Sequence, residues 1–397
     1  MMGVVEQKLR ELALPIEVTL WDGSTFSPYD NPEVSLKINS PSAATVFSRP
    51  TLGKIAKAYV QGMLDIDGEP KKIIEFGEKL VSRTSSTYQK RSKLFDWWRH
   101  TKPADRRSIQ HHYDVGNEFY GLWLDESRVY SCAYFKGEND SLDLAQQQKL
   151  DHICRKLMLK DGDRFLDIGC GWGALIVWAA QNYGVRSTGI TLSEEQFAFA
   201  TEKISRLGLE NNCKVELLDY RDLPLESKYD KIASVGMFEH VGKANLSVYF
   251  QKIYSLLNDG GMLMNHGITT NSLQDQPLGS DIGTFVDKYV FPGGELVHVS
   301  TVLEEMSKQG FELWDAECLR QHYARTLWQW VDRLEKNQEK ARALIGEERY
   351  RVWRIYMAGS AHAFERGWIS IFQMLGVRAQ KSGTVNHPLT RQHIYDE

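Results

Sequence analysis

The chain has 397 residues, of which 42% are hydrophobic and 25% are charged. This is enough for two globular domains with a sizeable core, and it excludes a disordered or fibrous chain. The net charge of −4 argues against a general nucleic-acid binder, and no apolar run approaches the roughly 18 residues of a membrane span. The five cysteines include no CxxC pair, so we expect reduced thiols in a cytoplasmic protein without disulfides or a metal site.

The first 81 residues are predicted to form a small mixed α+β domain. Residues 1–14 carry charges throughout, so they are not expected to be a secretory signal. Ile16–Leu20 and Val34–Ile38 alternate between apolar and polar residues as strands do, whereas Leu52–Gly62 and Lys71–Val81 have helical spacing.

Residues 82–107 change in character and are predicted to be a linker. The segment holds eight Lys or Arg residues against two Asp residues, together with Phe95, Trp97 and Trp98. Basic residues beside tryptophans are typical of segments that bind an anionic membrane surface. The alternative is a solvated linker whose tryptophans pack against a neighbouring domain.

Residues 108–397 are predicted to form one α/β domain, because strands and helices alternate as in a doubly wound sheet. The expected strands are Arg164–Ile168, Val185–Ile190, Lys214–Leu218, Lys231–Val235 and Gly261–His266. The expected helices are Leu144–Leu159, Ala174–Tyr183, Glu194–Leu207 and an arginine-rich helical stretch over Glu335–Gly359.

A glycine-rich turn, DIGCGWG over 167–173, follows the first strand of this domain and precedes a helix. Glycines let the backbone approach a ligand closely, and the helix N-terminus offers free N–H groups. No Lys or Arg lies in residues 167–174, so the turn suits a sulfonium ligand better than a phosphate. With Thr191 and Gln196 after the second strand and Asp219-Tyr220 after the third, this pattern predicts a class I (Rossmann-like) S-adenosylmethionine methyltransferase.

Two further polar side chains follow neighbouring strands. Glu239 comes after the fourth strand and His266 ends the fifth. Ligands of open α/β sheets bind beyond the carboxyl ends of the strands, so both side chains are predicted to face the transferred methyl group and to organise acid–base chemistry. The alternative is structural: His266 caps its strand and Glu239 pairs with a nearby cation.

Eight motifs in order carry a resemblance to a known family: HYDVGNEFY, YSCAYF, LDIGCGWG, GITLSEEQ, MFEHVG, NHGIT, FPGGE and HYARTL. This combination resembles the cyclopropane fatty acid synthases, including the mycolic acid cyclopropane synthases, over about residues 105–390. The N-terminal domain is similar, with less specific motifs, to the small lipid-binding domain of the bacterial phospholipid enzymes. The chain departs from the expected pattern after FPGG, at residues 295–298, and around Tyr323, which puts substrate preference in doubt.

The resemblance implies roles for the matching positions. The cofactor's methionine part would contact Tyr130 and Ser131, and a cradle would be formed by Asp167, Gly169, Gly171 and Gly173. The ribose would contact Thr191 and Gln196, and the adenine would be flanked by Tyr220 and Arg221. A bicarbonate ion would be bound by Cys132, Glu239, His266, Tyr323 and the backbone N–H of Ile268. For Cys132 a purely packing role is the stronger interpretation, because no activating base is adjacent.

The implied activity is transfer of a methylene unit from S-adenosylmethionine to the cis double bond of an unsaturated phospholipid acyl chain, through a carbocation with bicarbonate as base. One alternative keeps the cation but gives a methyl- or methylene-branched chain. Others are N-methylation of an amine, and a non-enzymatic lipid-binding protein that uses the cofactor as a sensor. We also expect a homodimer that binds reversibly to the inner face of the membrane and binds no nucleic acid.

Overall fold

The computed structural model describes residues 15–82, 115–272, 282–290, 294–384 and 387–395, and it divides into two compact units. The first gathers residues 1–92, 276–292 and 327–363, and the second gathers 93–275, 293–326 and 364–397. Both units are therefore discontinuous in sequence, whereas the sequence predicts contiguous domains. The predicted 82–107 linker lies, apart from its first residue, outside the described residues, and the boundaries at 81 and 107 stay a prediction.

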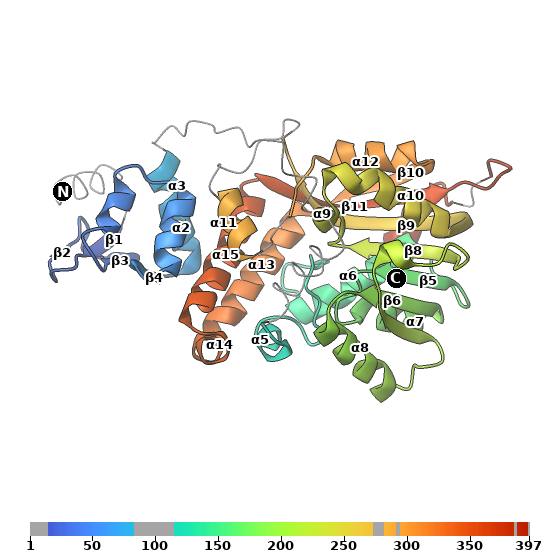
Figure 1. Cartoon of the computed structure of the whole chain (residues 1–397), viewed down its shortest axis with the longest axis horizontal. Helices are drawn as coiled ribbons and strands as arrows, with labels where there is room; N and C mark the ends of the chain where they lie inside the picture. Colours follow the sequence, from blue (N-terminus) through green and yellow to red (C-terminus); the bar gives the residue numbers. More distant parts are fainter. Residues whose placement is uncertain (1–14, 83–114, 273–281, 291–293, 385–386, 396–397) are drawn as a thin grey trace. The chain divides into compact units, whose positions relative to one another are not determined.

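The first unit contains a four-stranded sheet in the order β2-β1-β3-β4 (Figure 1). Its strands are β1 (Ile16–Thr19), β2 (Thr25–Phe26), β3 (Val34–Ile38) and β4 (Leu64–Gly68). β1 and β3 are parallel, and the other pairs are antiparallel. Every second residue of β1 and β3 is buried, as the alternating pattern predicts. This sheet packs with α2 (Leu52–Val60), α3 (Pro70–Ser82) and a 3-10 helix over Ala43–Phe47.

Helices from much later in the chain complete the core of this unit. They are α11 (Ile282–Tyr289), most of α13 (Arg320–Lys336), α14 (Gln338–Ile345) and most of α15 (Glu347–Glu365). Phe285, Val290 and Val352 are buried in the same apolar cluster as the strands. A sheet of four short strands needs a cover on its apolar face, and the later helices supply part of it.

The second unit is built on a seven-stranded sheet in the order β10-β11-β9-β8-β5-β6-β7. Its strands are β5 (Arg164–Ile168), β6 (Arg186–Thr191), β7 (Cys213–Leu217), β8 (Tyr229–Val235), β9 (Leu257–Thr270), β10 (Phe311–Cys318) and β11 (Ile369–Arg378). β5 to β9 are parallel, whereas β11 runs antiparallel to both β9 and β10. The predicted doubly wound α/β fold is confirmed.

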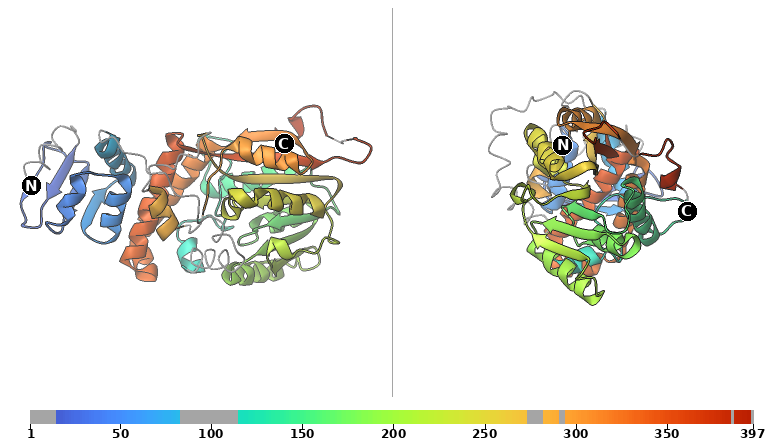
Figure 2. Two further views of the ribbon diagram at one scale, coloured as in Figure 1. Left: turned by 45° about the horizontal axis from the view of Figure 1, so that its top comes forward. Right: turned by 90° about the vertical axis from the view of Figure 1, so that its right-hand side faces the viewer.

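Helices cover both faces of this sheet (Figures 1 and 2). One apolar cluster includes α7 and the buried side of α6, and the other includes α10 and α12. The helices are α5 (Asn117–Gly121), α6 (Leu142–Lys156), α7 (Ala174–Tyr183), α8 (Glu194–Arg206), α9 (Phe238–Val241), α10 (Leu246–Leu256), α12 (Val299–Lys308) and α16 (Gln392–Tyr395). Sandwiching the sheet buries most residues of β8 and β9, including the polar residues Ser234, Asn265 and His266.

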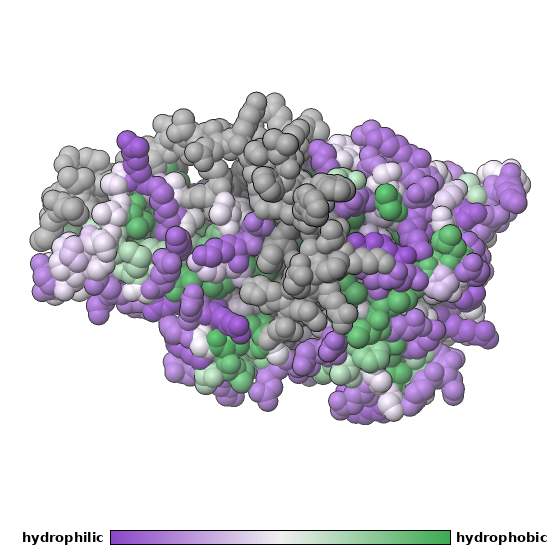
Figure 3. Space-filling model, viewed as in Figure 1, coloured by the Kyte–Doolittle hydropathy of each residue, from purple (hydrophilic) through white to green (hydrophobic). Residues whose placement is uncertain are grey.

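Hydrophobic residues on the face drawn in Figure 3 occur in small separate patches among hydrophilic ones. Among the described helices, none combines the length and the apolar character needed to cross a bilayer.

Candidate active site

The glycine-rich turn connects β5 to α7 through three residues with left-handed backbone. Gly169, Gly171 and Gly173 have φ values of 80°, 54° and 79°, a region in which residues with a Cβ are strained. A Cβ on Gly171 would meet no atom within 4 Å, whereas one on Gly173 would lie 3.0 Å from the Ala200 Cβ. Gly171 therefore borders open space, and Gly173 permits close packing against α8.

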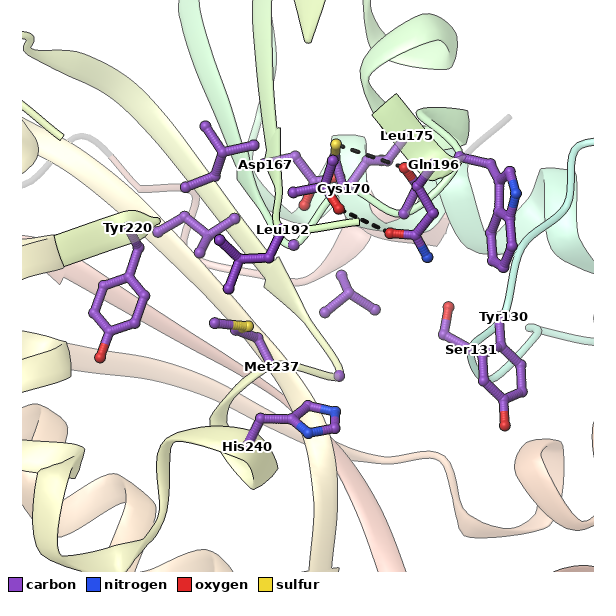
Figure 4. A pocket seen from close by; sticks show the side chains of 18 of the residues that line it. Tyr130, Ser131, Asp167, Cys170, Leu175, Leu192, Gln196, Tyr220, Met237 and His240 are labelled. Carbon is purple, nitrogen blue, oxygen red and sulfur yellow. Dashed lines mark hydrogen bonds between the residues drawn. The ribbon is translucent and has the colours of Figure 1, made fainter. Parts of the chain in front are cut away.

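This turn forms part of the wall of a pocket at the carboxyl ends of β5, β6 and β8 (Figure 4). Tyr130 and Ser131 lie on one side of it and Tyr220 on the other, with Asp167 and Gln196 between them. The separation of the two sides suits a long ligand with chemically different ends.

Polar groups near the ends of β6 and β7 are held by short local hydrogen bonds. The Thr191 hydroxyl donates to Gln196 Oε1 over 2.8 Å, which leaves the amide nitrogen of Gln196 turned toward the pocket (Figure 4). The guanidinium of Arg221 binds both carboxylate oxygens of Asp219, at 2.8 and 2.6 Å. The ring of Tyr220 is buried edge-on against Tyr249, with 5.2 Å between centroids.

Asp167 and Lys149 are an acidic and a basic residue that both line the pocket. Burial raises the pKa of Asp167 to about 7, an effect that Lys149 partly offsets. Burial lowers the pKa of Lys149 to about 8, against the attraction of Asp125 and Asp167. Asp167 Oδ1 is buried and has no hydrogen-bond partner among the described residues.

These features fit S-adenosylmethionine. The backbone is open at Gly171, an acidic oxygen is unsatisfied at Asp167, and residues 167–174 contain no cation that would bind a phosphate. When bound, the cofactor would supply the methyl group, and the residues that line the pocket would hold its methionine, ribose and adenine parts.

Glu239 lies on α9, just after β8, and His266 lies within β9, which continues to Thr270 rather than ending at His266 as predicted. The register partner of His266 is Val235, the last residue of β8, which lines the pocket. Glu239 Oε1 accepts a hydrogen bond of 2.6 Å from the backbone N–H of Ile268. The Gln373 amide nitrogen lies 3.1 Å from His266 Nδ1, and since an amide nitrogen only donates, the neutral imidazole carries its hydrogen on Nε2. Glu239 Oε2 and His266 Nε2 are buried and have no partner among the described residues.

The electrostatic state of this pair follows from its burial. Burial raises the pKa of Glu239 to about 7, which the N–H of Ile268 partly opposes. Burial also lowers the pKa of His266 well below its ordinary value, with Lys149 and Lys156 acting in the same direction. The pair at neutral pH is therefore a partly protonated carboxyl group and a neutral imidazole.

The Cys132 sulfur and the backbone N–H of Tyr323 both lie next to the Leu319 carbonyl. The Leu319 carbonyl accepts from the Tyr323 backbone N–H at 3.0 Å and lies 3.8 Å from Cys132 Sγ. The Leu319 N–H in turn donates to Ile371, whose register partner on β9 is Ile268. Burial raises the pKa of the Cys132 thiol, so this side chain is a neutral thiol at ordinary pH.

Nine of the ten predicted cofactor residues line the pocket, and Gly173, the exception, packs against α8 instead. None of the five residues predicted to bind bicarbonate is among the described lining residues. The roles of all fifteen stay predictions.

Sequence reasoning missed several lining residues, among them Lys149, Trp172, Met237 and His240. For Lys149 the sequence gives no such signal, because polar residues at helical spacing indicate a solvated helix face. The structure instead buries four of them on α6, Gln146, Lys149, His152 and Lys156.

The seven-stranded sheet, the glycine turn and the pocket together define a class I S-adenosylmethionine-dependent methyltransferase. Solved structures agree. A cyclopropane synthase from Mycobacterium tuberculosis is 33% identical, with a TM-score of 0.66 over 68% of this chain and 98% of that one. A mycolic acid cyclopropane synthase complexed with S-adenosylhomocysteine and CTAB is 32% identical, with a TM-score of 0.65 over the same shares.

Residues 100–374 match the family described as mycolic acid cyclopropane synthetase, and residues 6–90 match a domain of unknown function. A probable fatty acid methyltransferase from Pseudomonas putida is 42% identical over all of both chains. The chain belongs to the mycolic acid cyclopropane synthetase family, as its motifs predict, and is a methyltransferase of this lipid-modifying family.

Proposed function

We propose that this enzyme adds a methylene unit to the cis double bond of an unsaturated phospholipid acyl chain and so forms a cyclopropane ring. The observation that carries the proposal is that two buried polar atoms, Glu239 Oε2 on α9 and His266 Nε2 on β9, have no partner among the described residues. His266 is the register partner of Val235, which lines the cofactor pocket. A buried polar atom without a partner costs free energy, so its retention suggests a ligand or reacting group at that place.

The chemistry requires alignment and then removal of one proton. The π electrons of the alkene would form a bond to the methyl carbon as its bond to sulfur breaks, which leaves a positive charge on the second alkene carbon. Loss of a proton from the new methyl group would close the ring. Holding the alkene against the methyl group can contribute up to about 7–11 kcal/mol, and buried rings such as Tyr323 and Phe364, 4.7 Å apart, can stabilise the cation.

We further propose that bicarbonate binds between Glu239 and His266 and serves as the base. Its hydroxyl would donate to Glu239 Oε2, and one of its other oxygens would accept from His266 Nε2. The N–H of Ile268 is already taken by Glu239 Oε1, so its predicted contact with bicarbonate requires Glu239 to release it.

The second candidate is methylation of the same double bond without ring closure. The name of the relative from Pseudomonas putida, probable fatty acid methyltransferase, favours it. In this case a hydride shift followed by loss of a proton from the new methyl group would give a methylene-branched chain, and loss of a proton from the chain itself would give an unsaturated methyl-branched chain.

Purified protein, methyl-labelled S-adenosylmethionine and vesicles of a cis-unsaturated phospholipid test both candidates. We expect label in the lipid and upfield ring protons in the NMR spectrum of the product. Vinylic methylene protons instead would favour the second candidate, and unlabelled lipid would refute both. In buffer freed of carbon dioxide, turnover should fall and should recover when bicarbonate is added; turnover that ignores bicarbonate would remove it from the mechanism.

We propose reversible membrane binding through residues 82–107, since eight basic residues lie close to two tryptophans there. Flotation with anionic vesicles should weaken as salt rises, because exposed charges are screened over about 10 Å at 0.1 M salt. Replacing the basic residues of this segment by Ser should abolish flotation, whereas replacing the tryptophans alone should leave its salt dependence in place. Flotation unaffected by salt and by the basic substitutions would contradict this proposal.

A further inference from the structure

Lys149 is a buried cation inside the cofactor pocket that the functional assignments above leave unexplained. It is 2% exposed on α6 and lines the pocket. Its ammonium donates one hydrogen bond, of 3.0 Å, to the Ser131 hydroxyl. The other two N–H groups have no acceptor among the described residues. Burying an ammonium group with unsatisfied donors costs free energy of folding.

The acidic neighbours of Lys149 do not satisfy it by hydrogen bonding. The Asp125 carboxylate accepts from the backbone N–H groups of Val129 and Ser127, at 2.8 and 2.9 Å. Asp167 Oδ1 has no hydrogen-bond partner among the described residues. Lys149 and Asp167 are therefore a basic and an acidic group that line one pocket with unused hydrogen-bonding capacity.

The two arginines that line the pocket, Arg221 and Arg128, already contact other groups of the protein. Arg221 binds both oxygens of Asp219. Arg128 lies over the ring of Phe199, 4.6 Å from its centroid, and donates to the Asn117 carbonyl. Ser131 is held in place as well, since the Gln146 amide donates to its carbonyl at 2.9 Å.

We propose that Lys149, together with the Ser131 hydroxyl, binds the α-carboxylate of the methionine part of S-adenosylmethionine and of its product, S-adenosylhomocysteine. Asp167 faces the α-ammonium group of the same part, so the pocket floor matches both charges of the amino acid. The proposal concerns the cofactor alone and does not depend on which lipid product is formed.

The test measures affinity by calorimetry without lipid, for S-adenosylhomocysteine and for its α-carboxamide, which lacks the negative charge. A charge-assisted hydrogen bond of ordinary strength corresponds to about a 10- to 100-fold preference of the wild-type protein for the carboxylate. In K149M this preference should fall below about threefold. Methylthioadenosine, which lacks the amino acid altogether, should bind both proteins equally.

A matched control is K231M, because Lys231 is also buried but contacts Met262 Sδ outside the pocket. This variant should keep the full preference for the carboxylate. If K149M keeps it too, or loses methylthioadenosine in the same proportion, the assignment is overturned. Equal affinity of the wild-type protein for both ligands overturns it even where K149M does not fold. None of these results depends on lipid turnover, so they are independent of the proposed function.

Discussion

Glu239 is a buried carboxyl group that lowers the stability of the protein when it ionises, and it also has a proposed chemical role. The residue is 8% exposed, one carboxyl oxygen accepts a hydrogen bond from the Ile268 N–H, and the other has no partner among the described residues. For an acid, a pKa raised in the folded state means that folding becomes less favourable as the pH rises. From its ordinary value of 4.5 to about 7, this side chain progressively destabilises the protein, and above that range the cost is complete.

The E239Q variant should therefore be more stable than the wild-type protein at pH 8, by about 1–3 kcal/mol, and equally stable near pH 4. Its turnover should fall by about 10²- to 10⁴-fold, the range for loss of a group that organises acid–base chemistry. Urea unfolding at both pH values and the lipid-labelling assay measure the two effects.

The control is E304Q, since Glu304 is an exposed residue of α12 that pairs with Lys308. It should change stability by less than about 0.5 kcal/mol and leave turnover unchanged. Equal stability of E239Q and the wild-type protein at pH 8 would show that Glu239 carries no burial cost.

At the scale of elements, Gly267 sets how closely α9 approaches β9. A Cβ at this position would lie 2.2 Å from the Phe238 ring and 2.9 Å from Glu239 Oε1. The absence of a side chain on Gly267 thus lets α9 bring Glu239 against the backbone of β9.

We expect G267A to push α9 from the strand, with a loss of about 1–3 kcal/mol in unfolding free energy and at least tenfold in turnover. The matched control is G359A on α15, where a Cβ would meet nothing within 4 Å and Ala is favoured in a helix. Turnover of G267A close to that of the wild-type protein would contradict the role assigned to this close approach.

The sequence predicts elements well where one local signal is enough. Arg164–Ile168, Ala174–Tyr183 and Val34–Ile38 form over the expected residues, because continuous apolar runs, glycine boundaries or strict alternation mark them. β10 and β11 were not expected. Their pairing depends on contacts between segments far apart in sequence, which periodicity does not report.

The same distinction between local signals and long-range contacts applies to the candidate site. The turn at 167–173 is local in sequence, and the structure places it in the pocket as expected. The contact of His266 with Gln373 joins strands more than a hundred residues apart, and no local pattern indicates it. The resemblance to the cyclopropane synthase family predicted Tyr130 and Ser131 as pocket residues. It did not predict Lys149, which lies outside all eight motifs.

At the scale of the whole molecule, Arg354 joins the four-stranded sheet to the late helices within the first unit. Its guanidinium pairs with Glu335 through two bonds of 3.0 Å and donates to the carbonyls of Ile66 and Gly68 on β4. The residue is 9% exposed, and without it the partly buried Glu335 carboxylate would keep only the hydrogen bond from the Tyr350 hydroxyl among the described residues.

R354M should destabilise the first unit by about 1–3 kcal/mol, the usual cost of losing hydrogen bonds to a charged group, because the Glu335 carboxylate that it leaves is partly solvated. Hydrogen exchange in β3 and β4 should accelerate, while affinity for S-adenosylhomocysteine should be retained, because the pocket residues belong to the second unit. R349M, at an exposed position on α15, should change neither quantity. Loss of S-adenosylhomocysteine binding in R354M would show that the two units unfold together.

The position of β11 has a consequence for how the protein matures on the ribosome. This strand is the last of those described to be synthesised, yet it is inserted between β9 and β10 and supplies the amide that orients His266. A nascent chain that already contains the glycine turn and His266 still lacks Gln373, the hydrogen-bond partner of the His266 imidazole. The proposed role of His266 therefore requires β11, which is synthesised after all the other described strands.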